Sequence, residues 1–193
     1  MSAGMPMTLE IPARAKTRVT GEELLALGDI GRSELIEGEI IAMPPTSDVH
    51  GNIESNIDVA LKPFVRRHKL GRVMTGEVGI YIRRDPDTAR GADVVFISNA
   101  RLAQRGKSAF LDVAPELVVE VMSPEDRWNE VMKKLADYFS IGVRLVWVID
   151  AETQSVYAYR SLTDVRHFTA HDTLPGDDVL PGFVLPVAEI FAD

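Results

Sequence analysis

Leu117-Val118-Val119-Glu120-Val121-Met122 is the stretch that decides the fold of this chain. It is a short apolar run rich in β-branched residues, which is typical of a buried strand. A second apolar run, 143–149, follows a segment whose apolar residues recur at helical spacing. This order predicts two parallel strands joined by a crossover helix. The predicted fold class is therefore α/β, a mixed central sheet flanked by helices.

The crossover helix is predicted to begin directly after Ser123. Ser123 is a good N-cap residue, and Pro124 suits the first helical position. Asp126 stands three residues after Ser123, in the manner of a capping box. Gly142 is expected to end the helix.

Glu120 interrupts the first apolar run with a carboxylate. A buried carboxylate costs several kcal/mol unless it is paired, protonated or bound to a cation. Lys134 stands three residues after Val131 and four before Tyr138, which places it at the edge of the helix's apolar stripe. Lys134 can therefore reach over the sheet toward Glu120, whereas Lys133 falls on the polar face.

Asp93 is a second acidic residue, near the start of a strand predicted over 91–98. Because neighbouring strands lie about 4.8 Å apart, the carboxylates of Asp93 and Glu120 can face one metal ion. The backbone carbonyl of Val121 can add a third protein ligand. Mg²⁺ prefers such oxygen ligands, and Mn²⁺ is the expected substitute. Metal-assisted phosphodiester hydrolysis suits this set, with Lys134 orienting or deprotonating the attacking water.

Each of these residues also has a structural interpretation, which stays open at this point. Glu120 can serve a structural salt bridge, Asp93 can cap its strand, and Lys134 can extend its ammonium from the helix edge into solvent. His50 can contact phosphate, but two structural roles are equal alternatives: capping the long helix predicted to start at Ser47, or packing locally.

Local signals predict the remaining elements. Thr20-Gly21-Glu22-Glu23 is a capping box for a short helix, and Glu37-Gly38 is the turn of a hairpin. Two separate strands are predicted over 72–75 and 78–83, and an antiparallel pair over 155–160 and 165–169. Residues 1–18 are predicted to form a flexible arm and 19–193 a single domain.

Composition limits the function classes. The 193 residues include no cysteine, which excludes disulfides, thiolate zinc sites and cysteine nucleophiles. No apolar run approaches the roughly 18 residues of a membrane span, and no signal peptide is apparent, so a cytoplasmic protein is expected. The net charge of −8 argues against broad nonspecific nucleic-acid binding. The notable basic clusters are 66–69 and the group Arg101, Arg105 and Lys107, which together could track a phosphate backbone.

The order of Asp93, then Glu120 on a strand, then a basic residue resembles the PD-(D/E)xK nuclease superfamily. The chain more closely resembles the Uma-two-type family of restriction-endonuclease-like proteins. The residues that carry this resemblance are 34–40, His50-Gly51, Asp93-Val94-Val95-Phe96, 115–121 with Ser123-Pro124, 134–138, Gly142-Val143 and Trp147-Val148-Ile149-Asp150.

This resemblance implies a restriction-endonuclease-like fold and a metal-dependent endonuclease that hydrolyses DNA. It also implies that Glu34 is a further active-site acid. Two departures stand out: Ala92 replaces the proline before the aspartate, and Met122 occupies the usual position of the lysine. In the resembling family the lysine comes from the following helix, and Lys134 matches that site.

Two other functions stay open on the sequence. A nuclease-fold protein that does not cut and serves as a binding or assembly module is favoured by the acidic net charge. Metal-dependent hydrolysis of another phosphodiester is a third possibility. A homodimer is expected if both strands of a duplex are cut, because two symmetric sites achieve this most simply.

Overall fold

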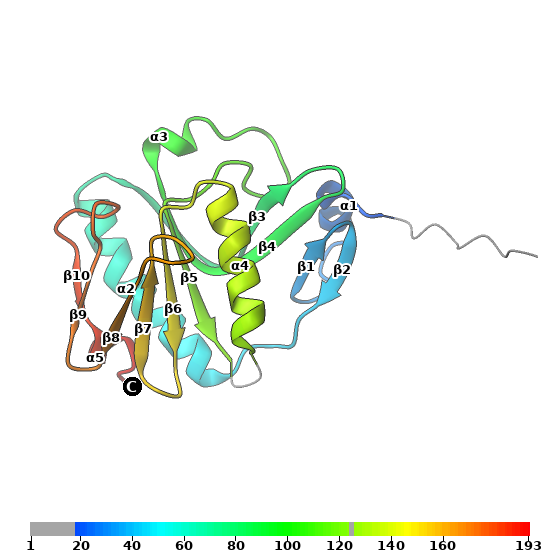
Figure 1. The fold of residues 1–193 in the computed structure, drawn as a ribbon. Coiled ribbons are helices and arrows are strands. Elements are labelled where there is room, and N and C mark those ends of the chain that lie inside the picture. The colour runs from blue at the N-terminus through cyan, green and yellow to red at the C-terminus, as the bar shows by residue number, and fades with distance from the viewer. Residues whose placement is uncertain (1–17, 124–125) are drawn as a thin grey trace, which may run out of the picture.

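A central eight-stranded sheet organises the protein. The computed structural model describes residues 18–123 and 126–193 (Figure 1). The strands follow the order β2-β1-β4-β5-β6-β7-β8, and β3 pairs with β4. The elements are α1 (Gly21–Ala26), β1 (Ser33–Ile36), β2 (Glu39–Ala42), α2 (Asp48–Arg67), β3 (Gly71–Arg83), β4 (Thr88–Ser98), α3 (Asn99–Leu102), β5 (Leu117–Met122), α4 (Trp128–Ser140), β6 (Leu145–Asp150), β7 (Ser155–Tyr159), β8 (Val165–Thr169), β9 (Thr173–Pro175), β10 (Val184–Pro186) and α5 (Val187–Ile190).

The predicted strand-helix-strand unit is confirmed. β5 and β6 pair in parallel, from Leu117 opposite Leu145 to Met122 opposite Asp150, and α4 connects them. The other strand pairs are antiparallel, so the sheet is mixed. The predicted α/β class with a mixed central sheet is therefore confirmed.

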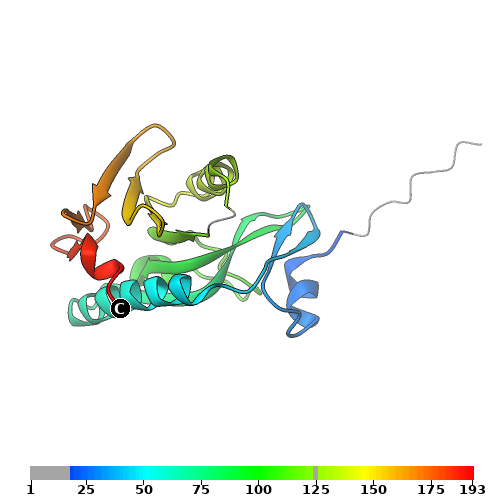
Figure 2. The ribbon, with the colours of Figure 1, turned by 90° about the horizontal axis from the view of Figure 1, so that it is seen from below.

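The long helices cover opposite faces of the sheet, α2 on one and α4 on the other (Figure 2). α2 buries an apolar stripe that includes Ile53, Ile57 and Leu61 in one core cluster. α4 buries Leu135 and Tyr138 in a second cluster on the other face. The central strands are covered on both sides, which explains why β5 and β6 are almost continuously apolar.

Local capping signals at the N-terminal side are confirmed. The Thr20 side chain and Glu23 form a reciprocal capping box at α1. The hairpin between β1 and β2 turns at Glu37 and Gly38, which have φ values of 53° and 80°. Ser47 caps α2 by accepting a hydrogen bond from the backbone N–H of His50.

The predicted start of the crossover helix is wrong. α4 begins at Trp128, with Arg127 as an N-cap residue that makes no side-chain capping bond. The backbone N–H of Ser123 donates to Asp126 Oδ2 at 2.8 Å, and the N–H of Asp126 donates to the Ser123 carbonyl at 3.0 Å. The bond from the Ser123 N–H to the Asp126 carboxylate is the one expected of a capping box, but Asp126 and Arg127 are not helical and α4 starts only after them. Pro124 lies outside the described residues.

The strands predicted over 72–75 and 78–83 are one strand, β3. A β-bulge between Thr75 and Val78 interrupts its register with β4. Gly76 and Glu77 occupy the bulge with positive φ values of 86° and 58°. Such a bulge imitates a strand break in the sequence pattern, and it frees the Gly76 N–H from the ladder.

The predicted flexible arm over residues 1–18 lies outside the described residues except for Arg18. The single domain over 19–193 stays a prediction. Over residues 18–123 and 126–193, no helix has the length and apolarity required to cross a membrane.

Candidate active site

A gap in the strand pairing of β4 creates the site. One edge of β4 pairs with β5 over Val94 to Phe96 and with β1 at Ala89. Along that edge, residues 90–93 have no strand partner within the described parts of the chain. We call these four residues the strand gap. The backbone N–H and carbonyl of Gly91 bond instead to side chains from β1 and α4, and the Asp93 side chain bonds to the backbone of β5.

Asp93 fills the β5 side of the strand gap. Its Oδ2 accepts a hydrogen bond from the backbone N–H of Val121 at 2.7 Å, replacing a ladder bond. Its Oδ1 lies 3.0 Å from Nε2 of His50, on the first turn of α2. The Asp93 side chain is 5% exposed. Asp93 therefore holds β4, β5 and α2 together at one point.

Glu120 and α4 form the other half of the site. Lys134 Nζ donates to Glu120 Oε2 at 2.9 Å, and the Tyr138 hydroxyl donates to Glu120 Oε1 at 2.5 Å. Both donors also lie 3.4 Å from the Gly91 carbonyl in the strand gap. The predicted contact between Lys134 and Glu120 is thus present. Lys133 instead pairs with Glu130 on the exposed face of the helix.

Glu34 joins this half of the site from β1. Its Oε1 accepts from the Gly91 backbone N–H and from Lys134 Nζ, both at 3.2 Å. Its Oε2 accepts from Arg90 Nη1 at 2.8 Å. Arg90 also pairs with Asp137 of α4 at 2.7 Å, so it fixes β1 against that helix. The structure therefore brings Glu34, Glu120 and Lys134 into one network.

Burial and neighbouring charge shift the proton affinities of this network. Burial raises the pKa of the Glu120 carboxyl to about 7; the Lys134 ammonium opposes this shift, and the Asp93 carboxylate adds to it. Burial alone would lower the pKa of Lys134, but the carboxylates of Glu120 and Glu34 outweigh it and hold the pKa above its usual value. Burial and the Glu120 carboxylate raise the pKa of the Tyr138 hydroxyl well above its ordinary value. Lys134 is therefore an ammonium at neutral pH.

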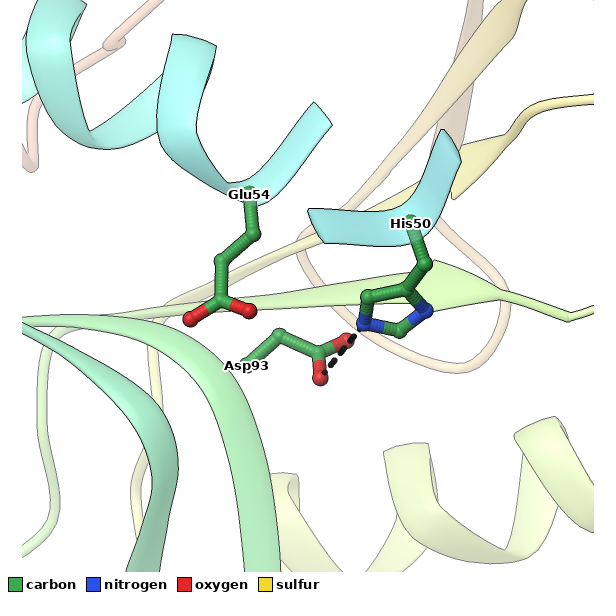
Figure 3. Close-up of side chains that lie close together, drawn as sticks. All are labelled: His50, Glu54 and Asp93. Carbon is green, nitrogen blue, oxygen red and sulfur yellow. Dashed lines mark hydrogen bonds and ion pairs between the residues drawn. The ribbon is translucent and has the colours of Figure 1, made fainter. Parts of the chain in front are cut away.

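Glu54 completes the site on the α2 side. It follows His50 by one helical turn, and its Oε1 accepts from the bulge N–H of Gly76 at 2.8 Å. His50, Glu54 and Asp93 each present a ligand atom within 4.8 Å of the other two (Figure 3). Burial raises the pKa of Glu54; the bond from Gly76 opposes the shift, and the Asp93 carboxylate adds to it.

Sequence reasoning missed Glu54, Arg90 and Tyr138 as site residues. Two signals could have indicated them: Glu54 lies four residues after His50, and Tyr138 lies four residues after Lys134, so each pair shares a helix face. Arg90 carries no comparable signal, because its contacts with Glu34 and Asp137 join segments far apart in the chain.

The basic clusters lie away from this site. Arg66 and Arg67 are exposed in the last turn of α2, roughly 25 Å along the helix from His50 at 1.5 Å per residue. Arg101 pairs with Glu116 and donates to the carbonyls of Ala114 and Pro115. Its main contacts are therefore structural.

The donor set fits a divalent cation. Around the strand gap, the carboxylates of Glu34, Glu54, Asp93 and Glu120 outnumber the neighbouring cations Lys134, Arg90 and Arg32. Of these cations, Arg90 also pairs with Asp137 and Arg32 with Glu77. Buried carboxylates in excess are costly without a compensating positive charge. Oxygen donors of this kind suit hard ions such as Mg²⁺.

Comparison with known proteins identifies the class. A crystal structure of "a putative nuclease belonging to DUF820" from Anabaena variabilis has a similar fold, with a TM-score of 0.76 and 23% sequence identity. The match covers 90% of this chain and 97% of that one. The fold is thus restriction-endonuclease-like, as predicted. A search of curated proteins found no match. The chain belongs to the Uma2 family, described as "Putative restriction endonuclease", which it matches over residues 22–188.

Proposed function

We propose that this protein is a divalent-metal-dependent endonuclease that hydrolyses phosphodiester bonds in DNA. The observation that carries the proposal is the strand gap, where the buried carboxylates of Asp93 and Glu120 lie beside the ammonium of Lys134. Membership of the Uma2 family supports the same activity.

In this proposal Asp93, Glu120 and the backbone carbonyl of Val121 hold Mg²⁺, with Mn²⁺ as its substitute. A bound divalent ion would polarise a phosphoryl oxygen and lower the pKa of a coordinated water. The hydrogen bond from the Val121 N–H fixes the Asp93 carboxylate at the end of the β4–β5 pairing. The side chains are thus positioned before any ligand arrives.

Lys134 acts as a cation in this proposal. Because its pKa is held above the usual value, it donates hydrogen bonds and does not remove a proton from water at neutral pH. Its ammonium would orient the attacking water and offset the negative charge that develops on the phosphate. Glu34 contacts the same ammonium and keeps it directed toward the strand gap.

The test is cleavage of supercoiled plasmid DNA by the purified protein in Mg²⁺ or Mn²⁺, beside Asp93→Asn and Glu120→Gln variants. We expect nicked and linear products from the wild type and a loss of at least about a hundredfold in either variant, because each removes a charge from the metal site. Cleavage that survives in both folded variants would refute the proposed site.

We also propose that the active form is a homodimer, as expected from the sequence. Analytical ultracentrifugation of the active protein would test this.

The net charge of −8 favours a second candidate function, a nuclease-fold module that binds or assembles without cutting. A wild-type protein that binds DNA or a protein partner but leaves every phosphodiester substrate intact in both metals would support this alternative.

A further inference from the structure

We propose that His50 and Glu54 form, with Asp93, a cation site that prefers transition metals such as Mn²⁺ to Mg²⁺ or Ca²⁺. This site lies on the α2 side of Asp93, whereas Lys134 and Tyr138 approach Glu120 from α4 on the opposite face. The inference shares only Asp93 with the metal ligands proposed above, so the two can fail independently.

The three side chains converge from two elements. His50 and Glu54 are four residues apart on the first turns of α2, which places them on one helix face. Figure 3 shows both side chains directed toward Asp93 of β4, and their ligand atoms all lie within 4.8 Å of one another. One ion can therefore contact all three without a rearrangement of the backbone.

Backbone hydrogen bonds hold two of the three ligand side chains in place. The Glu54 carboxylate accepts a hydrogen bond from Gly76 at 2.8 Å, and the Asp93 carboxylate accepts one from Val121 at 2.7 Å. Both donors are backbone N–H groups at breaks in strand pairing, one in the β3 bulge and one at the end of the β4–β5 pairing. Such second contacts orient metal ligands and raise affinity.

The His50 imidazole is 95% buried, but only one of its two ring nitrogens has a hydrogen-bond partner among the described residues. Its side chain is 5% exposed, and Nε2 lies 3.0 Å from Asp93 Oδ1. Nδ1 is buried and has no hydrogen-bond partner among residues 18–123 and 126–193. The Asp93 carboxylate only accepts hydrogen bonds, so it places the proton on Nε2 in the metal-free protein. A metal that takes Nε2 would shift this proton to Nδ1. With the proton on Nδ1, the Nε2 lone pair faces the carboxylates and can bind a metal.

The donor set decides the class of metal. An imidazole nitrogen suits Mn²⁺ and the later transition metals, whereas Mg²⁺ and Ca²⁺ prefer oxygen ligands only. The two carboxylates supply negative charge, and the nearby guanidinium of Arg32 already pairs with Glu77. One nitrogen and two carboxylate ligands thus favour a divalent transition metal.

The experiment measures Mn²⁺ and Mg²⁺ binding directly, by the loss of the free-Mn²⁺ paramagnetic resonance signal and by competition with Mg²⁺. The variants are His50→Gln, which retains a donor toward Asp93 without the imidazole, and Glu54→Gln. His68→Gln is the matched control, because His68 is an exposed histidine at the other end of the same helix. All are also made in a Glu120→Gln background, which removes a ligand of the catalytic metal.

We expect His50→Gln to weaken Mn²⁺ binding at least about tenfold and Mg²⁺ binding less than about threefold, so that the preference for Mn²⁺ falls. Glu54→Gln should weaken both metals, and His68→Gln neither. In the Glu120→Gln background, Mn²⁺ binding should persist and should still depend on His50.

Equal loss of Mn²⁺ and Mg²⁺ in His50→Gln would make His50 a structural partner of Asp93 and overturn the inference. So would unchanged Mn²⁺ affinity in either variant, or an absence of Mn²⁺ preference in the wild type. Should His50→Gln fail to fold, Glu54→Gln and the wild-type preference decide the question. Mn²⁺ binding that is lost with Glu120→Gln but insensitive to His50 would leave the catalytic proposal standing and refute this one.

Discussion

Replacing Glu120 by Gln should stabilise the metal-free protein. The folded structure holds the pKa of Glu120 at about 7 against an ordinary value of 4.5, so its charge opposes folding above that range. Gln fits the same contacts: its oxygen can accept from Lys134, and its amide can donate to the Tyr138 hydroxyl, which in turn lies 3.4 Å from the Gly91 carbonyl. Lys134 keeps Glu34 as an ionic partner at 3.2 Å.

The magnitude follows from proton linkage. Between the unfolded-state pKa and about 7, the folded wild type retains a proton that the unfolded chain has lost, so its free energy of unfolding falls as pH rises. At 1.36 kcal/mol per pKa unit, the difference amounts to at most about 3 kcal/mol. For a domain of this size, that is up to roughly 10 °C in melting temperature.

The assay is thermal unfolding in chelator at pH 8 and pH 5. The Gln variant should melt at or above the wild type at pH 8, and the difference should shrink toward pH 5, where Glu120 is already protonated in the folded protein. Glu130→Gln is the control, because Glu130 forms only an exposed pair with Lys133. A Glu120→Gln protein that melts well below the wild type at pH 8 would show that Glu120 serves a structural ion pair, and our reasoning would be refuted.

Three further outcomes are expected. Lys134→Ala should abolish plasmid cleavage in Mg²⁺ while Lys133→Ala retains most of it, because only Lys134 contacts Glu120; equal effects in gel assays would contradict this. Mg²⁺ should raise the melting temperature of the wild type in a concentration-dependent way and that of Glu120→Gln far less, as differential scanning calorimetry can determine. Arg66→Ala combined with Arg67→Ala should reduce the slope of log affinity for DNA against log salt by about 1 to 2 units, and an unchanged slope would remove this helix end from the interface.

Much of the fold could be predicted because its signals are local. The apolar runs of β5 and β6 and the helical spacing of α4 predicted the parallel unit, and the caps at Thr20 and Ser47 marked helix starts. The start of α4 was mispredicted for the same reason, because Ser123 and Asp126 carry the residue types of a capping box and bond to each other, yet the helix begins only at Trp128. A short sequence pattern does not distinguish a capping box at the first turn of a helix from the same contact made ahead of the helix.

The contact between Glu120 and Lys134 was also predictable, since a carboxylate in an apolar strand and a lysine at the edge of the next helix's apolar stripe must meet once the helix covers the strand. The strand gap could not be predicted from the sequence. It depends on β4 pairing with β1 and β5 at different points along one edge, and sequence patterns do not specify the register between distant strands.

The sequence by itself thus determined the order of the elements, the α/β class and the acidic and basic residues available for chemistry. Only the tertiary structure decided that Glu54, Arg90 and Tyr138 join them. Glu54 is held by a bulge in β3, Arg90 bridges β1 and α4, and Tyr138 reaches Glu120 across the sheet surface. Each contact depends on strand register, a bulge or helix placement, which long-range packing fixes and local sequence does not.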